Sequence, residues 1–331
     1  MITLKELARR AGVSVSTVSR VVNGNDEKAA GRETRERIWQ IVRESGYVPD
    51  EAAQGLKRRE DPRESTGRIA CVFARAPHSP TDPFFSQIAR SIEHSCLTAG
   101  YGTMGTFTAD AFLEGGHPPP DGVVVLGRYS RSFLAKLRQV CQHIVYAGLN
   151  SVRDPVDQVV CDGYGAAREA VRYLYALGHR RICYVGELDN EARFRGFYDE
   201  NTQMGCKPGA GLIAETLQSR EGGYTAARRL LQGGDLPDAL FCANDLTALG
   251  VLDYAAEAAV PIPQALSVIS IDNIEACQRS SPMLTSIDIP KEEIGRVTAR
   301  VLIDRMEGGH SLPLHVQIPF TLCKRGSCQP K

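Results

Sequence analysis

From residue 68 onward, short apolar runs rich in β-branched residues alternate with segments of helical periodicity. The strand-like runs are RIACVF (68–73), GVVVLG (122–127), HIVYAG (143–148), QVVCD (158–162), RICYVG (181–186), ALFCAND (239–245) and LSVISID (266–272). Apolar strands that alternate with helices predict parallel sheets that are covered on both faces. Roughly 260 residues of this pattern are too many for one comfortable sheet, so we expect two α/β lobes.

The N-terminal 45 residues follow a different pattern, with three helix-like segments and no convincing strand. In the first segment, Thr3 and Glu6 have the spacing of a capping box, and Gly12 predicts the end of the helix. In the last, residues 32–46, the apolar side chains recur at helical spacing. We therefore expect a small helical unit ahead of the α/β body.

The middle segment, VSVSTVSRVVNG (13–24), is a strand by residue preference alone. No partner strand is predicted before Gly46, however, and a lone strand leaves its backbone groups unpaired. If the segment is instead a helix with Ser14 as its N-cap, Val18 and Val22 face the first helix across a short turn. This is the helix-turn-helix arrangement, whose second helix is free to enter a major groove.

Two interpretations of the outward face of this segment stay open at this point. Either its small side chains and arginine read DNA, or it is a solvent-facing helix of a small bundle. Residues 1–60 carry 12 Lys/Arg and 9 Asp/Glu in a chain of zero net charge, which is a weak basic bias. The DNA interpretation assigns base contacts to Val15, Ser16 and Arg20, and phosphate contacts to Ser14, Thr17, Ser19 and Asn23.

TLKELARRAGVSVSTVSRVVNG (3–24), followed by TRERI and SGYVPDEAAQGLK, resembles the lactose/galactose repressor (LacI/GalR) family of bacterial transcriptional regulators. ALFCANDLTALGVL and LSVISIDN extend the resemblance to the body. The resemblance implies an α plus α/β fold: an N-terminal helix-turn-helix head and a two-lobed, periplasmic-binding-protein-like α/β body. We divide the chain into the head (1–48), a hinge helix and linker (49–67), and an effector-binding and dimerisation domain (68–331).

The resemblance also implies a DNA-contacting role for the hinge. Leu56 falls on the position of a leucine that wedges into a central minor-groove step and kinks it. Ala53 is implied to pack beside it, and Lys57 to contact a phosphate. Without the resemblance, the residues alone favour an ordinary apolar linker residue at Leu56.

Polar residues that directly follow predicted strands point to a ligand cleft, since ligands of α/β proteins bind at the carboxyl ends of strands. Asn244 and Asp272 stand at two such ends. The resemblance places both on sugar-contacting positions of the family. It adds Arg193, because the effector-binding arginine of the family stands three residues before a glycine, here Gly196.

Three further assignments leave alternatives open. In DPFF (82–85), Phe84 or Phe85 either stacks on a sugar face or belongs to the core. Asp245 either lines the cleft or only caps the helix that follows it. Arg128, directly after GVVVLG, is a weaker candidate for an effector contact.

Together these features predict a sequence-specific DNA-binding regulator, most simply a repressor, whose operator affinity is allosterically controlled by a small carbohydrate such as a galactoside. We expect a cytoplasmic homodimer that binds operator DNA and the effector, with no membrane association, no cofactor and no metal. The alternatives are a sugar-binding carrier, or a regulator that answers to a non-sugar ligand such as a nucleobase.

Three other sequence patterns argue against a dinucleotide-binding protein, an enzyme and a metal-binding or disulfide-linked protein. GYGTMG (100–105) matches a dinucleotide-binding fingerprint, but a helix precedes it where that fingerprint needs a strand. No nucleophile or base constellation indicates an enzyme. Ten cysteines without CxxC spacing favour buried reduced thiols over a metal or disulfide framework.

Two expectations concern chain segments rather than residues. The stretch between GTFTAD and DGVVVLG is shorter than the usual family pattern, which predicts a missing or reduced helix. The tail around Cys323 and Cys328 is expected to be frayed, and it has no leucine heptads that would join dimers into tetramers.

Overall fold

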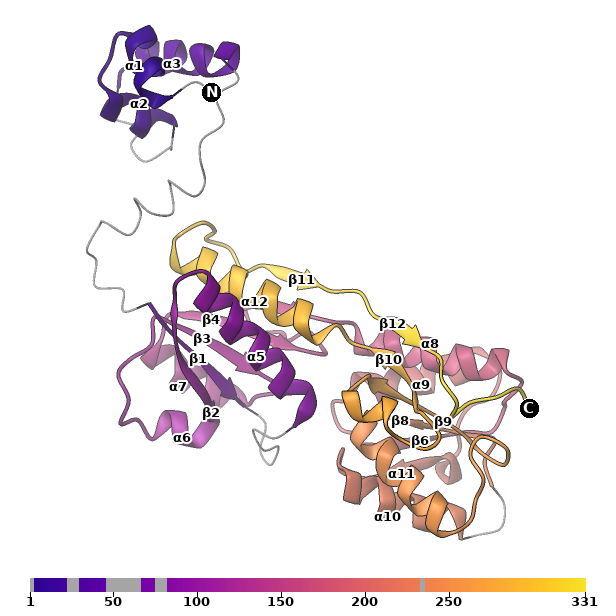
Figure 1. Cartoon of the computed structure of the whole chain (residues 1–331). Helices are drawn as coiled ribbons and strands as arrows, with labels where there is room; N and C mark the ends of the chain where they lie inside the picture. The colour runs from indigo at the N-terminus through magenta and orange to yellow at the C-terminus, as the bar shows by residue number, and fades with distance from the viewer. Residues whose placement is uncertain (1–2, 23–29, 46–66, 75–81, 233–235) are drawn as a thin grey trace. The chain divides into compact units, whose positions relative to one another are not determined.

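The computed structural model describes residues 3–22, 30–45, 67–74, 82–232 and 236–331. The chain divides into two compact units, Met1–Ser65 and Thr66–Lys331, each drawn with its own helices in Figure 1. The finer division at residues 48 and 67 remains a prediction, because the hinge lies outside the described residues.

The first unit contains three helices: α1 (Leu4–Ala11), α2 (Val15–Val22) and α3 (Arg32–Ser45). The Thr3 side chain accepts a hydrogen bond from the Glu6 amide, and Gly12 ends α1 in the left-handed conformation with φ 67°. The segment with strand-like preference is therefore a helix. Its start is capped by Ser14, whose Oγ accepts from the Thr17 amide at 3.1 Å.

One small apolar core holds the three helices together. Val18 is fully buried, as the helical interpretation requires, and Val21 is buried beside it, which the sequence analysis did not anticipate. The remaining core side chains are Leu7, Ala8, Ala11, Val22, Ile38 and Val42. Because these valines make the packing, tertiary contact outweighs their intrinsic preference for strands.

The second unit is built on two six-stranded sheets, as predicted for two α/β lobes. The sheet of lobe 1 has the order β11-β5-β4-β3-β1-β2. Its strands are β1 (Arg68–Phe73), β2 (Gly102–Thr108), β3 (Gly122–Leu126), β4 (His143–Gly148), β5 (Asp157–Val160) and β11 (His315–Gln317). Its helices are α5 (Pro83–Thr98), α6 (Ala109–Leu113), α7 (Arg131–Val140) and α12 (Lys291–Met306).

Helices cover both faces of the lobe 1 sheet. Cys71 and Phe73 of β1 pack in the same core cluster as Ile88 of α5, whereas Val72 packs with Leu137 of α7 on the opposite face. This alternation is the two-sided burial that the continuous apolar runs predicted. The five-residue α6 fits the expectation of a reduced helix in that part of the chain.

The sheet of lobe 2 has the order β12-β10-β9-β8-β6-β7 and is parallel except for the β10–β12 pair. Its strands are β6 (Ile182–Gly186), β7 (Ile213–Glu215), β8 (Ala239–Cys242), β9 (Ser267–Asp272), β10 (Thr285–Asp288) and β12 (Thr321–Cys323). Its α-helices are α8 (Gly163–Ala176), α9 (Ala192–Gln203), α10 (Arg220–Leu231) and α11 (Asp245–Glu257). Two short 3-10 helices, η1 (Ala210–Leu212) and η2 (Glu275–Gln278), complete it.

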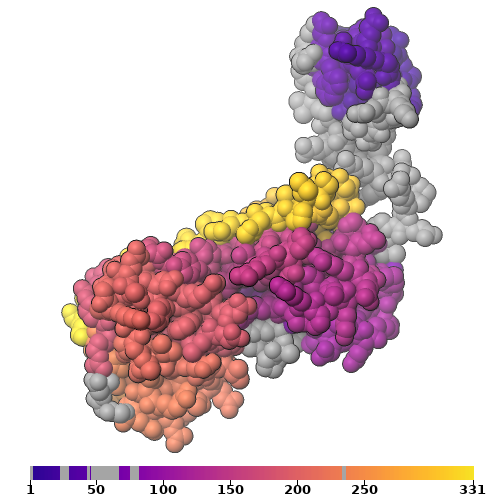
Figure 2. Space-filling model, turned by 180° about the vertical axis from the view of Figure 1, so that it is seen from behind, coloured from indigo at the N-terminus to yellow at the C-terminus, as the bar shows by residue number. Residues whose placement is uncertain are grey.

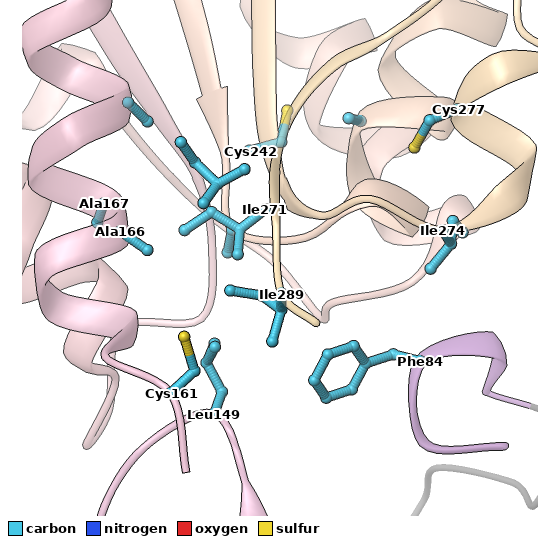
Figure 3. Close-up of a cluster of buried hydrophobic side chains, with 14 of the residues drawn as sticks. Phe84, Leu149, Cys161, Ala166, Ala167, Cys242, Ile271, Ile274, Cys277 and Ile289 are labelled. Atoms are coloured by element: carbon cyan, nitrogen blue, oxygen red, sulfur yellow. The ribbon is translucent and has the colours of Figure 1, made fainter. Parts of the chain in front are cut away.

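The chain passes between the lobes at residues 161–162, 289–290 and 318–320. The C-terminal part, coloured yellow, runs along both lobes in the front and back views (Figures 1 and 2). Apolar side chains pack around these connecting segments. Figure 3 shows Phe84 projecting from α5 toward Ile289, with Leu149 and Cys161 nearby. The joint between the lobes is therefore part of one continuous core.

The C-terminal tail is ordered against lobe 2, so the expectation of a frayed tail is wrong. Ser327 is fully buried; its Oγ accepts from the Thr285 amide at 2.8 Å and donates to the Val268 carbonyl at 2.6 Å. All ten cysteines are free, and seven are buried as predicted. No helix among the described residues is long and apolar enough to span a membrane.

Candidate functional site

A cleft lies between the two lobes at the carboxyl ends of their strands. The free space in it is about 40 Å³, which is below the usual range for ligand pockets. Five of the six predicted effector residues line it, together with three that sequence reasoning did not select. The lining is Asp82, Phe84, Phe85, Leu149, Arg193, Gln218, Asn244 and Asp272.

Arg193 lies at the start of α9 and is buried, whereas Arg195 on the same helix is exposed. The cause is local packing. A Cβ on Gly196 would lie 2.3 Å from the Tyr164 carbonyl oxygen, so only glycine lets α9 rest against α8. That close contact orients the helix so that Arg193, one turn earlier, turns inward.

The Arg193 guanidinium is held by a dense set of hydrogen bonds. Its Nε and Nη2 donate to the two carboxylate oxygens of Glu191, at 2.8 Å and 2.9 Å. Nη2 also donates to Gln218 Oε1 at 2.7 Å, and Nη1 donates to the Ala243 carbonyl at 2.7 Å. The guanidinium is therefore fixed before any ligand arrives.

Glu191 is the hub of this network, and the sequence analysis did not select it. Its carboxylate caps α9 by accepting from the Arg193 amide, and it also accepts from Gln218 Nε2 at 2.9 Å. Although burial opposes ionisation, the neighbouring arginines lower the pKa of Glu191 to about 2. The sequence signal was present in the EARFRG run, where an acidic residue stands at the N-cap position of the helix.

Asn244, rather than Asp245, caps α11. Asn244 Oδ1 accepts from the Thr247 amide at 3.0 Å and from the Thr247 hydroxyl at 2.6 Å. Asp245 is fully buried behind the cleft, where its carboxylate accepts from Ser286 Oγ and the Ile274 amide, each at 2.7 Å. The structure thus assigns Asp245 to neither of its two predicted roles.

Asp272 ends β9 with φ at 120°, a backbone conformation that non-glycine residues rarely adopt. A buried ammonium stabilises this turn: Lys291 Nζ donates to the carbonyls of Asp272, Asn273 and Ile289, the last at 2.9 Å. Burial raises the pKa of the Asp272 carboxyl well above its usual range. Lys291 was not selected from sequence, and it begins the helix that returns the chain to lobe 1.

The lobe 1 wall is mostly apolar. Phe84 is buried and Phe85 is half-buried, and their ring centroids lie 5.0 Å apart in an edge-to-face arrangement. Phe85 is therefore better placed than Phe84 to meet a ligand face, and Phe84 serves mainly the core. Asp82 caps α5 by accepting from the Phe84 amide at 2.9 Å.

Arg128 does not line the cleft. It reaches from lobe 1 into the turn before α9 of lobe 2, where Nη2 donates to Glu187 at 2.8 Å and to Glu191 at 3.1 Å. Its Nη1 donates to the carbonyls of Asp189 and Asn190. Arg128 and Arg193 therefore share one carboxylate, which connects the cleft to the contact between the lobes.

In the first unit, the face of α2 that points away from the core carries the predicted base-contacting residues. Val15 is 43% exposed, and Ser16 and Arg20 are exposed as well. Thr17 and Ser19 are half-buried. The Ser14 hydroxyl lies 2.8 Å from the hydroxyls of Ser16 and Thr17. The other predicted DNA contacts, Asn23, Ala53, Leu56 and Lys57, lie outside the described residues.

Across the described ranges, no group of three or more His, Cys, Asp or Glu side chains could hold a metal ion. GYGTMG follows α5 and continues into β2, so a helix precedes it, as predicted. It therefore lacks the strand-to-helix context that a dinucleotide phosphate needs.

Comparisons with known proteins agree with this two-part organisation. The family model described as "Bacterial regulatory proteins, lacI family" matches residues 3–50, and the "Periplasmic binding protein-like domain" model matches residues 171–328. The HTH-type transcriptional repressor MelR of Bacillus subtilis is 30% identical over 99% of this chain and 98% of its own length.

Two further matches cover nearly the whole chain. The HTH-type transcriptional repressor PurR of Erwinia tasmaniensis is 29% identical over 99% of this chain and 97% of its own. The structure described as "transcriptional regulator CelR-cellobiose complex" superposes with a TM-score of 0.71 at 26% identity, covering 99% of this chain and all of that one.

Proposed function

Because the chain belongs to the LacI family of bacterial regulatory proteins, we propose that it is a repressor whose affinity for operator DNA changes when a small carbohydrate binds in the cleft. The observation that carries the proposal is the presence of two separate sites in one chain. One unit presents an exposed helix-turn-helix face, and the other gathers five predicted effector residues in one cleft.

On the DNA side, we assign base contacts to Val15, Ser16 and Arg20. All three are exposed, which supports this role. Val15 and Ser16 begin α2, where a recognition helix contacts base edges, and Arg20 follows one turn later. Ser14, Thr17 and Ser19 are assigned to phosphates. As a homodimer, two such heads would match a palindromic operator.

On the ligand side, the cleft has the composition that a sugar requires. Carboxylate and amide groups on one wall can bond to hydroxyls, and the Phe85 ring on the other can pack against the apolar face of a pyranose. The cellobiose complex of CelR, a protein with the same architecture, supports a carbohydrate over other ligand classes. A galactoside is the first ligand to test.

The two sites are coupled through the lobes. A ligand that contacts both walls favours a closed arrangement of lobes 1 and 2, and any change in lobe 1 is passed to the segment that leads to the head. The hinge role of residues 49–67 is part of this proposal. Arg128 contributes by linking lobe 1 to the network that holds Arg193.

The test uses the intact protein and its single tryptophan, Trp39, which is exposed on α3 of the DNA-binding unit. Operator sequences are selected from a random duplex library, and binding is then followed by Trp39 fluorescence with and without sugars. We expect sequence-specific binding that weakens steeply with salt and shifts with a carbohydrate. Equal affinity for every duplex, with or without sugars, would refute the proposal.

A further inference from the structure

Arg193 has almost no hydrogen-bonding capacity left for a ligand. A guanidinium carries five N–H donors, and four of those in Arg193 are already used on Glu191, Gln218 and the Ala243 carbonyl. Binding a carboxylate or phosphate in a fork takes two parallel donors, and only one remains here. Arg193 therefore offers a ligand a single bond.

The charge of Arg193 is also neutralised. Arg193 donates through Nε and Nη2 to the Glu191 carboxylate, which has no exposed side-chain surface, and Arg128 binds the same carboxylate. An anionic ligand in the cleft meets a guanidinium whose field is largely cancelled by its own counter-ion.

Unpaired acceptors, by contrast, face the cleft. Asp272 is only 6% exposed, and within the described part of the chain its carboxylate oxygens have no hydrogen-bond donor. Asp82 uses one oxygen, Oδ1, on the Phe84 amide. These carboxyl oxygens open onto the cleft and can accept further hydrogen bonds, so the favourable ligand is one that donates hydrogen bonds to them.

We infer that the cleft selects an uncharged, hydroxyl-bearing ligand and rejects phosphorylated or carboxylated forms of the same ligand. The inference rests on the proposed function, since it specifies the chemical class of the effector. Its physical content is that Asp82 and Asp272 line the cleft, while Arg193, the only arginine among the described lining residues, is already paired. A ligand anion would lie beside the Asp82 carboxylate, and among the described residues the cleft offers no cation that is not already paired.

The experiment is calorimetric titration of the full chain with galactose, galactose 6-phosphate and galacturonate, and with the same three forms of glucose. For the sugar that binds, we expect its phosphate and its acid to bind at least about a hundredfold more weakly. Equal or tighter binding of an anionic form would overturn the inference but leave a sugar-responsive repressor intact. Failure of every sugar, with operator recognition retained, would remove both the carbohydrate assignment and this inference.

Two variants test the cause of the selectivity. Asp272→Asn replaces one carboxyl oxygen by an amide N–H donor that a phosphate can accept from, so the ratio between the neutral and phosphorylated forms should fall at least about tenfold. Asp253→Asn makes the same change on α11 at a surface pair with Arg220, outside the cleft, and should leave the ratio unchanged. An unchanged ratio in Asp272→Asn would contradict the inference.

Glu191→Gln provides the opposite test, because it removes the counter-ion of Arg193 while keeping a side chain of similar shape. Anionic sugars should then gain affinity relative to the neutral form. If Glu191→Gln folds and its selectivity equals that of the unmodified chain, the neutralisation of Arg193 does not explain the selectivity and the inference fails.

Discussion

The two walls of the cleft are built in different ways. Lobe 2 contributes Arg193, Gln218, Asn244 and Asp272, whose positions are fixed by hydrogen bonds within lobe 2 or by the strained end of β9. Lobe 1 contributes two phenylalanines, Leu149 and one carboxylate. The difference indicates a division of work in which lobe 2 recognises the hydroxyl pattern and lobe 1 closes an apolar surface over it.

The largest expected effect comes from removing the centre of the lobe 2 wall. Arg193→Ala should retain operator binding but weaken effector affinity at least about a hundredfold, because the buried Glu191 carboxylate loses its main partner. Operator titrations with and without effector measure both properties in one sample. Arg195→Ala, an exposed arginine on the same helix, is the matched control. A normal effector response in Arg193→Ala would mean that the cleft is assigned wrongly.

Acid should weaken lobe 2 through Glu191. The folded pKa of Glu191 is about 2, below its ordinary value of 4.5, so the stability it contributes is complete above pH 4.5 and is lost as the pH falls toward 2. The free-energy difference between the unmodified chain and Glu191→Gln should shrink by about 2 kcal/mol between pH 6 and pH 3. Urea unfolding at pH 6 and pH 3 measures it; a difference that stays constant would exclude an ionised Glu191.

Removing the contact that Arg128 makes between the lobes should have an intermediate effect. Arg128→Ala deletes four hydrogen bonds from lobe 1 to the turn at 187–191, so fewer molecules should hold the closed arrangement. We expect effector affinity to fall about tenfold. Arg131→Ala, an exposed arginine on α7, serves as the control. If both variants bind the effector equally well, the bonds of Arg128 do not contribute to closure.

The smallest effect is expected on the lobe 1 wall. Phe85→Leu keeps an apolar side chain but loses the aromatic face, and effector affinity should fall about threefold. Phe84→Leu should instead lower the thermal midpoint of unfolding, because Phe84 is buried in the core between the lobes. Calorimetric titration and thermal melts of the two variants separate these outcomes; identical behaviour would erase the distinction between the two rings.

The sequence predicted the residues that line the cleft better than it predicted the hydrogen-bond network that holds Arg193 in place. Asn244 and Asp272 were found because the carboxyl ends of parallel strands meet at one edge, which is a local rule. The position of Glu191 at the start of α9 indicated a cap only. Its bonds to Arg128 and Gln218, which lie 63 and 27 residues away in the chain, are reported by no local pattern.

The organisation of the C-terminal part was also beyond the sequence pattern. The predicted elements ended at Asp272, whereas α12 and β11 return the chain to lobe 1 and β12 then joins lobe 2. The periodicity of apolar residues predicts whether a segment is a helix or a strand, but it does not predict which of the two sheets a strand joins or which sheet a helix covers. Lys291, which stabilises the strained end of β9, could be found only once that return was known.

The central claim is that a ligand between the two walls controls DNA binding, and thermodynamic reciprocity tests it most directly. Effector affinity is measured by calorimetry on the free protein and on the protein saturated with its selected operator. The account predicts that the two effector dissociation constants differ by the same factor by which the effector changes operator affinity. Effector binding that is equally tight in both samples would contradict it.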